Sequence, residues 1–223
     1  MFEEIKILIW DFDGTFYKPN AALFHAVREA EYRVISEHNR WTRKKTVEAF
    51  KKLHKIVYPS ATETVAHIVG ISTADAAVEM ENYFDRRDFL SRDERLIELF
   101  QKLKKYRHII LANGVIARHK ETLKVLGVPA ETFELFVTSE VVGKTKPHPE
   151  GFQYVLNYTK LPASAHLMIG DRDMVDLAPA KTIGMKTCLV WSDEKNLSAD
   201  VVLPTVYDLP SVLEIFSMYH ELE

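Results

Sequence analysis

The chain has 223 residues, of which 47% are hydrophobic and 27% are charged, and its formal net charge at pH 7 is -3. This length suits one large domain or a domain with a smaller insertion, and the charge gives no reason to expect a nucleic acid or an anionic membrane as partner. No apolar run approaches the ~20 residues of a transmembrane helix. The single cysteine excludes an internal disulfide, so we expect a cytoplasmic protein.

The first predicted element is a strand at residues 5–12, where an unbroken apolar run ends in the sequence Asp-Phe-Asp-Gly-Thr. No strand pattern follows between residues 19 and 88, which form a helical block. The first helical pattern begins at Pro19 and Asn20 and places Leu23, Val27, Ala30 and Val34 on one face. Three more helical patterns follow at about 42–57, 62–69 and 73–84. Gly70 is placed to end the third helix, and Ser72 with Asp75 to cap the fourth.

From residue 91 onward, strands alternate with helices. Ser91 and Glu94 match a capping box at the start of a helix that runs to about residue 105. Asp208 is placed to cap the C-terminal helix. Strands are predicted at 107–112, 135–138, 166–169, 187–190 and 201–203. This alternation predicts right-handed crossover units and a parallel sheet.

We therefore expect an α/β fold in which a doubly wound parallel sheet, a Rossmann-like core, carries an inserted all-helical domain. The core consists of residues 1–17 and 89–223, and the insertion consists of residues 18–88. The insertion leaves and re-enters the core beside Asp13, so we expect it to cover that end of the sheet as a lid.

Polar side chains follow the predicted strands at the edge where open α/β sheets bind ligands. They are Asp11, Asp13 and Thr15 after the first strand, Asn113 and Gly114 after the second, Lys144 and Lys146 after the third, and Asp171, Asp173 and Asp176 after the fourth. Converging carboxylates suit Mg²⁺, and the amides of Thr15, Asn113 and Gly114 could cradle an anion beside a lysine. Together these groups describe a phosphoryl site, whereas an Asp-rich turn or a lysine-rich loop alone is usually just solvated.

In this order, the motifs resemble those of the haloacid dehalogenase superfamily of hydrolases, in its phosphatase branch. The matching stretches are Asp11-Phe12-Asp13-Gly14-Thr15, Leu111-Ala112-Asn113-Gly114, Lys146-Pro147-His148-Pro149-Glu150 and Gly170-Asp171 through Asp176. Lys146 is preferred to Lys144 because it alone directly precedes Pro-x-Pro-Glu. The helical block between the first and second motifs resembles the helical cap of this family.

The resemblance implies a role for each matching residue. Asp11 is expected to attack phosphorus and form an aspartyl-phosphate, and Asp13 to protonate the leaving oxygen and then deprotonate water. Mg²⁺ is expected on the Asp11 carboxylate, the Asp13 backbone carbonyl and Asp171, with Lys146 paired to the phosphate and to Asp11. Asp176 is expected to lie behind these groups and to orient Lys146 or a metal-bound water.

One residue departs from the family pattern. Ala112 stands where the family has a Ser or Thr whose hydroxyl donates to the transferring phosphoryl group, and loss of one such donor can cost on the order of 10²–10³ in rate. The expected function is a Mg²⁺-dependent phosphatase for a small soluble phosphomonoester: a sugar phosphate, phosphoglycolate or a nucleoside monophosphate. A phosphomutase, or a catalytically weak phosphate-binding or interaction protein, is the alternative, whereas the dehalogenase branch has no use for Asp13.

Side chains near the predicted hinge of the helical block are candidate substrate contacts, namely Tyr17, Lys18 and His25. The aromatic side chains of the block are expected in its core rather than as a substrate platform; they are Phe24, Tyr32, Trp41, Phe50, Tyr83 and Phe84. The sequence pattern does not determine an oligomeric state.

Overall fold

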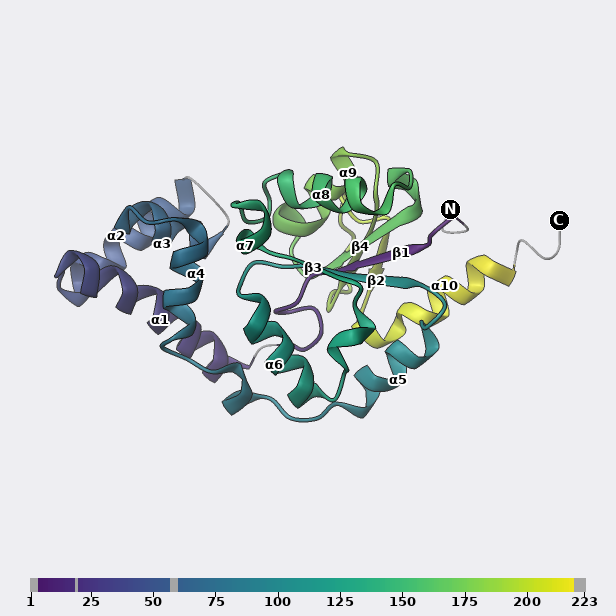
Figure 1. Ribbon diagram of the computed structural model, residues 1–223, viewed down its shortest axis with the longest axis horizontal. Coiled ribbons are helices and arrows are strands. Elements are labelled where there is room, and N and C mark those ends of the chain that lie inside the picture. The colour runs from purple at the N-terminus through teal and green to yellow at the C-terminus, as the bar shows by residue number, and fades with distance from the viewer. Residues whose placement is uncertain (1–3, 19, 57–59, 219–223) are drawn as a thin grey trace.

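The computed structural model describes residues 4–18, 20–56 and 60–218. Its core is a six-stranded sheet with the strand order β3-β2-β1-β4-β5-β6 (Figure 1). The strands are β1 (Ile7–Trp10), β2 (Arg107–Leu111), β3 (Leu135–Val137), β4 (His166–Gly170), β5 (Lys186–Val190) and β6 (Val201–Leu203). Every pair of neighbours is parallel, which confirms the predicted doubly wound α/β core.

The first strand lies in the middle of the sheet. β1 pairs with β2 on one side and β4 on the other, so that Trp10 lies opposite Ile110 and Ile169. All four residues of β1 are buried, which explains why it is an unbroken apolar run rather than an alternating one. Since the chain order reverses at β1, the residues that follow it emerge at the switch point of the sheet, where such folds bind ligands.

Helices cover both faces of the sheet (Figure 1). α5 (Glu94–Lys102), α6 (Ile116–Leu126) and α10 (Leu209–Met218) pack on one face, and α8 (Glu150–Thr159) and α9 (Ala178–Thr182) pack on the other. A short helix that the sequence pattern did not predict, α7 (Ser139–Val142), follows β3. Among the described residues, no helix combines the length and hydrophobicity needed to cross a membrane.

The predicted helical block is present, and it lies beyond the carboxyl ends of the strands (Figure 1). Its helices are α1 (Ala21–Asn39), α2 (Arg43–Ile56), α3 (Ala61–Val69) and α4 (Thr73–Glu81). They enclose their own hydrophobic cluster, centred on Ile35, Phe50 and Val65, separate from the two clusters of the sheet. Residues 20–56 and 60–88 contain no strand, as predicted. The exact domain boundaries at residues 17 and 88 remain a prediction.

Three of the predicted helix ends form as expected. The Asn20 side chain accepts a hydrogen bond from the third residue of α1 at 2.8 Å, and the Ser72 hydroxyl accepts one from the third residue of α4 at 3.0 Å. Gly70 ends α3 in the left-handed conformation, with φ at 81°. Pro19 and Val57, at the ends of two predicted helices, lie outside the described residues.

Two predicted caps are wrong. α5 begins at Glu94 rather than at residue 91, so Ser91 precedes the first turn, and Asp93 caps the helix by accepting hydrogen bonds at 2.9 and 3.1 Å. Near the C-terminus, Thr205 is the capping residue. Asp208 is instead the third residue of that turn, and its carboxylate accepts from the Thr205 amide at 3.0 Å. In both cases the first turn begins at another residue than the sequence pattern indicated, and the residue that precedes that turn becomes the cap.

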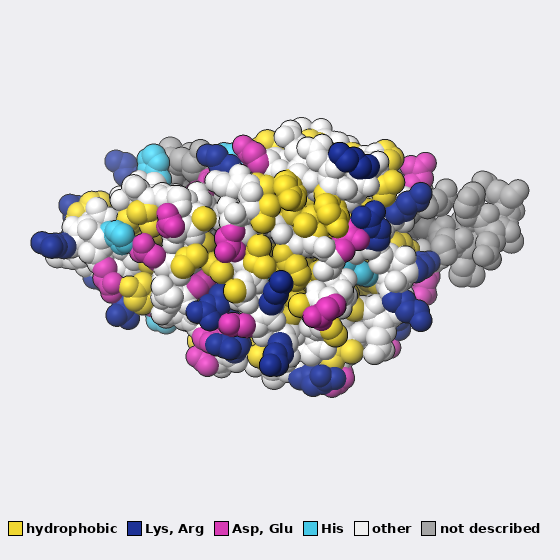
Figure 2. Space-filling model, viewed as in Figure 1, with side chains coloured by type: hydrophobic (Ala, Val, Ile, Leu, Met, Phe, Trp, Pro, Cys, Tyr) yellow, Lys and Arg dark blue, Asp and Glu magenta, His cyan; other side chains and the backbone are white. Residues whose placement is uncertain are grey.

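On the face shown in Figure 2, basic and acidic side chains are interspersed and form no extended region of one sign. Surface charge therefore gives no reason to expect a polyanionic partner on this face. The chemistry-bearing residues gather instead at the carboxyl edge of the sheet.

Candidate active site

A buried lysine joins two of the predicted aspartates at this edge. The Lys146 ammonium donates to Asp11 Oδ1 at 2.6 Å and to Asp176 Oδ1 at 2.5 Å. None of the three side chains is more than 3% exposed. Burial lowers the pKa of Lys146, but the two carboxylates outweigh burial and raise this pKa, so the lysine is charged. Lys144, the other candidate lysine, is exposed.

The loop after β1 fixes the second oxygen of Asp11. The Thr15 hydroxyl donates to Asp11 Oδ2 at 3.1 Å. The Thr15 amide donates to the Phe12 carbonyl at 3.2 Å within the same tight turn. It is therefore already occupied and does not cradle an anion in this arrangement, contrary to the expectation from the sequence.

Three carboxylates meet beside this loop. Asp11, Asp171 and Asp176 each place one oxygen within 4.8 Å of the others. Asp176 already accepts from Lys146 and, at 3.1 Å, from the Arg172 amide. Asp171 Oδ1 is buried, accepts no hydrogen bond, and lies 3.8 Å from Arg172 Nε.

The electrostatics of this cluster favour a bound cation. Burial, followed by the charges of Asp11 and Asp176, raises the pKa of Asp171 to about 8. A hard divalent cation would both neutralise the repulsion and give Asp171 the missing partner. The cluster thus fits the predicted Mg²⁺ site, with Asp11 and Asp171 as ligands and Asp176 engaged with Lys146.

Two glycines allow these carboxylates to converge. Gly14 has φ at +88°, and a Cβ at this position would lie 2.3 Å from Asp171 Oδ2. A Cβ on Gly170 would lie 2.5 Å from the Cβ of Asp176. Any larger residue at either position would push an aspartate away from the cluster, so space alone requires a glycine at both positions.

The Asn113 side chain forms hydrogen bonds with the protein backbone. Its Oδ1 accepts from the Lys146 amide at 2.8 Å, and its Nδ2 donates to the Lys146 carbonyl at 3.0 Å. The side chain therefore clamps the loop that carries the lysine. Asn113 and Gly114 line the same cavity as Asp11, and neither of their amides donates to another described residue.

Ala112, the residue that departs from the family pattern, lies between the end of β2 and Asn113. Ala112 is 3% exposed and packs in the hydrophobic cluster of the sheet, and its amide donates to the Val137 carbonyl at 3.0 Å. It offers no hydroxyl, so any donor from this strand end must be a backbone amide of residue 113 or 114.

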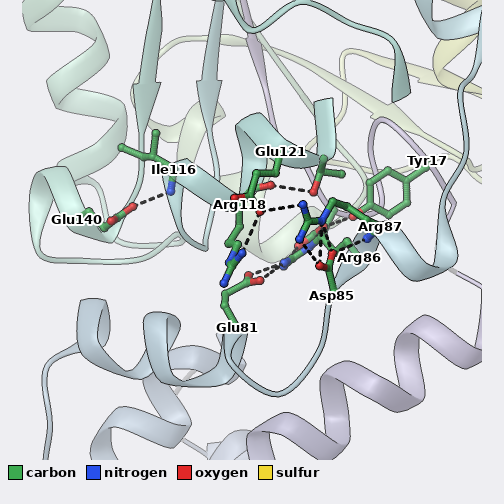
Figure 3. Close-up of polar contacts among 11 residues, drawn as sticks. Tyr17, Glu81, Asp85, Arg86, Arg87, Ile116, Arg118, Glu121 and Glu140 are labelled. Atoms are coloured by element: carbon green, nitrogen blue, oxygen red, sulfur yellow. Dashed lines mark hydrogen bonds and ion pairs between the residues drawn. The ribbon is translucent and has the colours of Figure 1, made fainter. Parts of the chain in front are cut away.

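Asp13 is held by an arginine that the sequence did not indicate. Arg86 Nε donates to Asp13 Oδ1 at 2.8 Å and Arg86 Nη2 donates to Oδ2 at 2.7 Å, while Nη1 binds the Glu81 carboxylate. The Tyr17 hydroxyl also donates to Asp13. Figure 3 shows Arg86 between Glu81 and the Tyr17 side of the site.

This arginine determines the protonation state of Asp13. Burial alone would raise the pKa of Asp13, but the Arg86 guanidinium outweighs burial and holds this pKa well below its usual range. Asp13 is therefore a carboxylate while Arg86 contacts it. No motif marks Arg86; its only signal in the sequence is its position close to the predicted end of the helical block.

A cavity of about 230 Å³ separates the edge of the sheet from the helical block. The sheet side contributes Asp11, Asp13 and Asn113, and the block side contributes Arg28, Glu31 and His54. The sequence identified the first three and missed the last three, because polar residues on an amphipathic helix look the same whether they face a cavity or solvent.

Two expectations about the block need correction. Phe24 is 63% exposed and lines the cavity, so its assignment to the core is wrong: it lies on the side of α1 that faces the sheet. Phe84 also lines the cavity, whereas Tyr32 and Phe50 are buried as predicted. The described lining includes none of the hinge candidates Tyr17, Lys18 and His25.

Comparison with known proteins identifies the family of this chain. Residues 5–184 match the family model of haloacid dehalogenase-like hydrolases. A glyceraldehyde 3-phosphate phosphatase of Methanocaldococcus jannaschii is 37% identical over 115 residues, which cover 51% of this chain and 49% of that protein. One from Pyrococcus abyssi is 36% identical over 86 residues, covering 39% of this chain and 35% of that protein. The chain thus spans at most about half the length of the curated relatives it matches.

Solved structures agree on the fold. A HAD phosphatase from Thermococcus onnurineus superposes with a TM-score of 0.67 at 19% identity, covering 94% of this chain and 98% of that one. CbbY from Rhodobacter sphaeroides, solved with phosphate, gives a TM-score of 0.64 at 18% identity, covering 92% of this chain and 96% of that one. Because the family model covers most of the chain and all four motifs, the chain belongs to the haloacid dehalogenase-like hydrolase family.

Proposed function

We propose that this protein is a Mg²⁺-dependent phosphatase that hydrolyses a small soluble phosphomonoester of the sugar phosphate type through an aspartyl-phosphate. The observation that carries this proposal is the buried Lys146 between Asp11 and Asp176, with the unsatisfied Asp171 beside it. The relatives named glyceraldehyde 3-phosphate phosphatase support the phosphatase class and suggest a small sugar phosphate.

The residues divide the reaction into two displacements. In the first, an Asp11 oxygen attacks phosphorus, the P–O bond to the leaving alcohol breaks, and the alcohol oxygen takes up a proton. In the second, water attacks the same phosphorus and the bond to Asp11 breaks, releasing inorganic phosphate. Lys146 stabilises the added negative charge, and the free amides of Asn113 and Gly114 are donors for the phosphoryl oxygens.

Mg²⁺, held by Asp11, Asp171 and the Asp13 backbone carbonyl, would supply charge neutralisation between the phosphate and the attacking carboxylate. Asp13 is the proposed proton carrier in both steps. Because Arg86 keeps Asp13 ionised, Asp13 can act as a base as it stands, and it can act as an acid only after the guanidinium turns away from it.

Phosphate release is expected from the wild-type protein with Mg²⁺ on a panel of phosphomonoesters that includes glyceraldehyde 3-phosphate, and none from Asp11→Asn. The substitution keeps the size of the side chain but removes the nucleophile. Malachite-green detection of phosphate measures both, and Tm confirms folding. Equal release by both proteins would contradict the proposed intermediate. Tight phosphate binding without turnover of any ester would favour the phosphate-binding alternative that Ala112 permits.

Replacing Ala112 tests the missing hydroxyl directly. Ala112→Thr and Ala112→Val add side chains of the same shape, and only Thr carries a donor. We expect kcat of the Thr variant to exceed that of the Val variant by at least about 10-fold, because one oriented donor can contribute 10²–10³ in rate. Steady-state kinetics on one ester provide the comparison, and the Val variant controls for crowding at this buried position. Equal rates would mean that the site works without this donor.

A further inference from the structure

A buried carboxylate that takes no part in the proposed reaction lines the cavity from α1. Glu31 is 2% exposed, and its Oε2 lies 2.7 Å from Arg28 Nη1. Apart from this contact with Arg28, no described donor reaches Oε2, so the carboxylate keeps accepting capacity. Burial raises the pKa of Glu31 to about 7, which the charge of Arg28 only partly offsets. A buried carboxylate with unused accepting capacity is costly unless a donor reaches it.

A second acceptor reaches the same cavity from α2. The Thr64 hydroxyl donates its one proton to the Ser60 carbonyl at 3.0 Å. The 3.1 Å contact between Thr64 Oγ1 and His54 Nδ1 therefore requires Nδ1 to be the donor. Burial, followed by the charges of Arg28 and Arg172, lowers the pKa of His54, so the ring is neutral and its Nε2 carries a lone pair.

One buried ring holds these groups in place. Phe50, which is 1% exposed, lies under the Arg28 guanidinium at 4.7 Å and stacks on the His54 ring with centroids 5.2 Å apart. We call Arg28, Glu31 and His54 the acceptor wall. It faces the cavity that also contains Asp11, so a phosphate ester bound at the sheet edge would direct its other end toward this wall.

The charges of the wall limit what it can bind. Its single cation, Arg28, is paired with Glu31, and His54 is neutral. Of the other arginines of the cavity lining, Arg86 binds Asp13 and Glu81, and Arg172, on the sheet side, lies 3.8 Å from Asp171. A carboxylate of a substrate that reached this wall would meet Glu31, which is a like charge, and the lone pair of His54 Nε2.

We propose that the acceptor wall binds the hydroxyl groups of an uncharged polyol or sugar chain and rejects a substrate whose end opposite the phosphate is a carboxylate. This inference rests on the proposed function and names its substrate class. Hydroxyl groups satisfy Glu31 and His54 Nε2, whereas a chain without donors leaves both unpaired, and sites built for a hydroxyl discriminate strongly against analogues that lack it.

Three esters with three-carbon chains test the wall. Glycerol 3-phosphate carries hydroxyls, propyl phosphate has the same chain without them, and 3-phosphoglycerate ends in a carboxylate. For the wild-type protein with Mg²⁺, we expect kcat/KM to be highest for glycerol 3-phosphate, exceeding the other two by at least about 10-fold. A wild-type preference for 3-phosphoglycerate would overturn the proposal.

The Glu31→Gln variant tests whether the acceptor wall causes the preference for glycerol 3-phosphate. It keeps the shape of the side chain but weakens the acceptor, so the glycerol 3-phosphate to propyl phosphate ratio of kcat/KM should fall by about 10-fold, mainly through KM. Glu37→Gln is the matched control, because Glu37 lies on the same helix, is 49% exposed and pairs with Arg33. A fall of the same size in the Glu37→Gln variant, or none in Glu31→Gln, would contradict the assignment.

Two further measurements separate this inference from the proposed function and from misfolding. Calorimetric binding of the three esters to Asp11→Asn, with and without Glu31→Gln, ranks the ligands even if no ester turns over. Suppose that no ester turns over, but glycerol 3-phosphate still binds most tightly and Glu31→Gln removes this preference. The phosphatase proposal would then be rejected, and the proposal for the acceptor wall would be retained. Tm at pH 8 should not fall in Glu31→Gln, since the substitution removes a buried charge; a lower Tm together with lost selectivity would indicate a structural role instead.

Discussion

Replacing Lys146 with Met is expected to abolish phosphate release and to lower the free energy of unfolding by about 3–5 kcal/mol. The ammonium binds Asp11 and Asp176 at 2.6 and 2.5 Å, and neither carboxylate is more than 3% exposed. Without the lysine, both carboxylates stay buried beside Asp171 and have lost the cation that contacts them. The loss of stability thus arises from the carboxylates left behind more than from the two hydrogen bonds lost.

A double-mutant cycle separates stability from chemistry. Adding Asp176→Asn to Lys146→Met removes one of the uncompensated charges, so stability should recover in part while activity stays absent. Denaturant unfolding gives the free energies, and phosphate release gives the activity. Lys144→Met is the matched control, because this neighbouring lysine is exposed, and its effect on stability should lie within about 0.5 kcal/mol. Activity retained by the Lys146→Met variant would remove the main support for the proposed function.

Asp171→Asn is expected to stabilise the metal-free protein at neutral pH and to abolish its stabilisation by Mg²⁺. The pKa of Asp171 is raised from 3.8 to about 8 by burial and by the neighbouring carboxylates. Between these values the folded protein binds more protons at this site than the unfolded chain, so the stability of the metal-free protein falls as pH rises through this window. Asn cannot ionise, and it flattens this part of the pH profile.

Mg²⁺ is expected to reverse the effect in the wild-type protein, because the proposed site binds it only in the folded state and with the cluster ionised. At a concentration 100 times its Kd, such a ligand adds about 2.7 kcal/mol. Tm measured from pH 4 to pH 8, with Mg²⁺ and with EDTA, checks both parts. Asp193→Asn, at an exposed position, should retain the Mg²⁺ response. A full response in Asp171→Asn would place the cation elsewhere.

Much of the sheet side of the site was predictable. Asp11, Lys146 and Asp171 each follow a predicted strand, and parallel strands bring their carboxyl ends to a common edge whatever the packing details. Local order along the chain is therefore enough to place these residues together. The same reasoning identified the glycines of the motifs but not their task, which is to make room for Asp171 and Asp176.

The block side of the site was not predictable from the same signals. Arg86 contacts Asp13 across 73 residues, and Glu31 looks like any acidic residue of an amphipathic helix. Whether such a side chain meets solvent, a carboxylate or a cavity depends on how the helices lie against the sheet. Phe24 could not be placed from the sequence for the same reason. An aromatic residue in a helical pattern is expected in a core, yet this one is exposed at the cavity.

By itself, the sequence determined the parallel α/β core, the helical insertion and the identity of the groups at the sheet edge, because strand periodicity and chain order specify these locally. Only the tertiary structure decided that Asp13 is held as a carboxylate by Arg86, that Asn113 clamps the backbone of Lys146, and that Glu31 lines the cavity. These features depend on the relative placement of elements far apart in the chain, and burial then alters the charge and hydrogen-bonding capacity of each group.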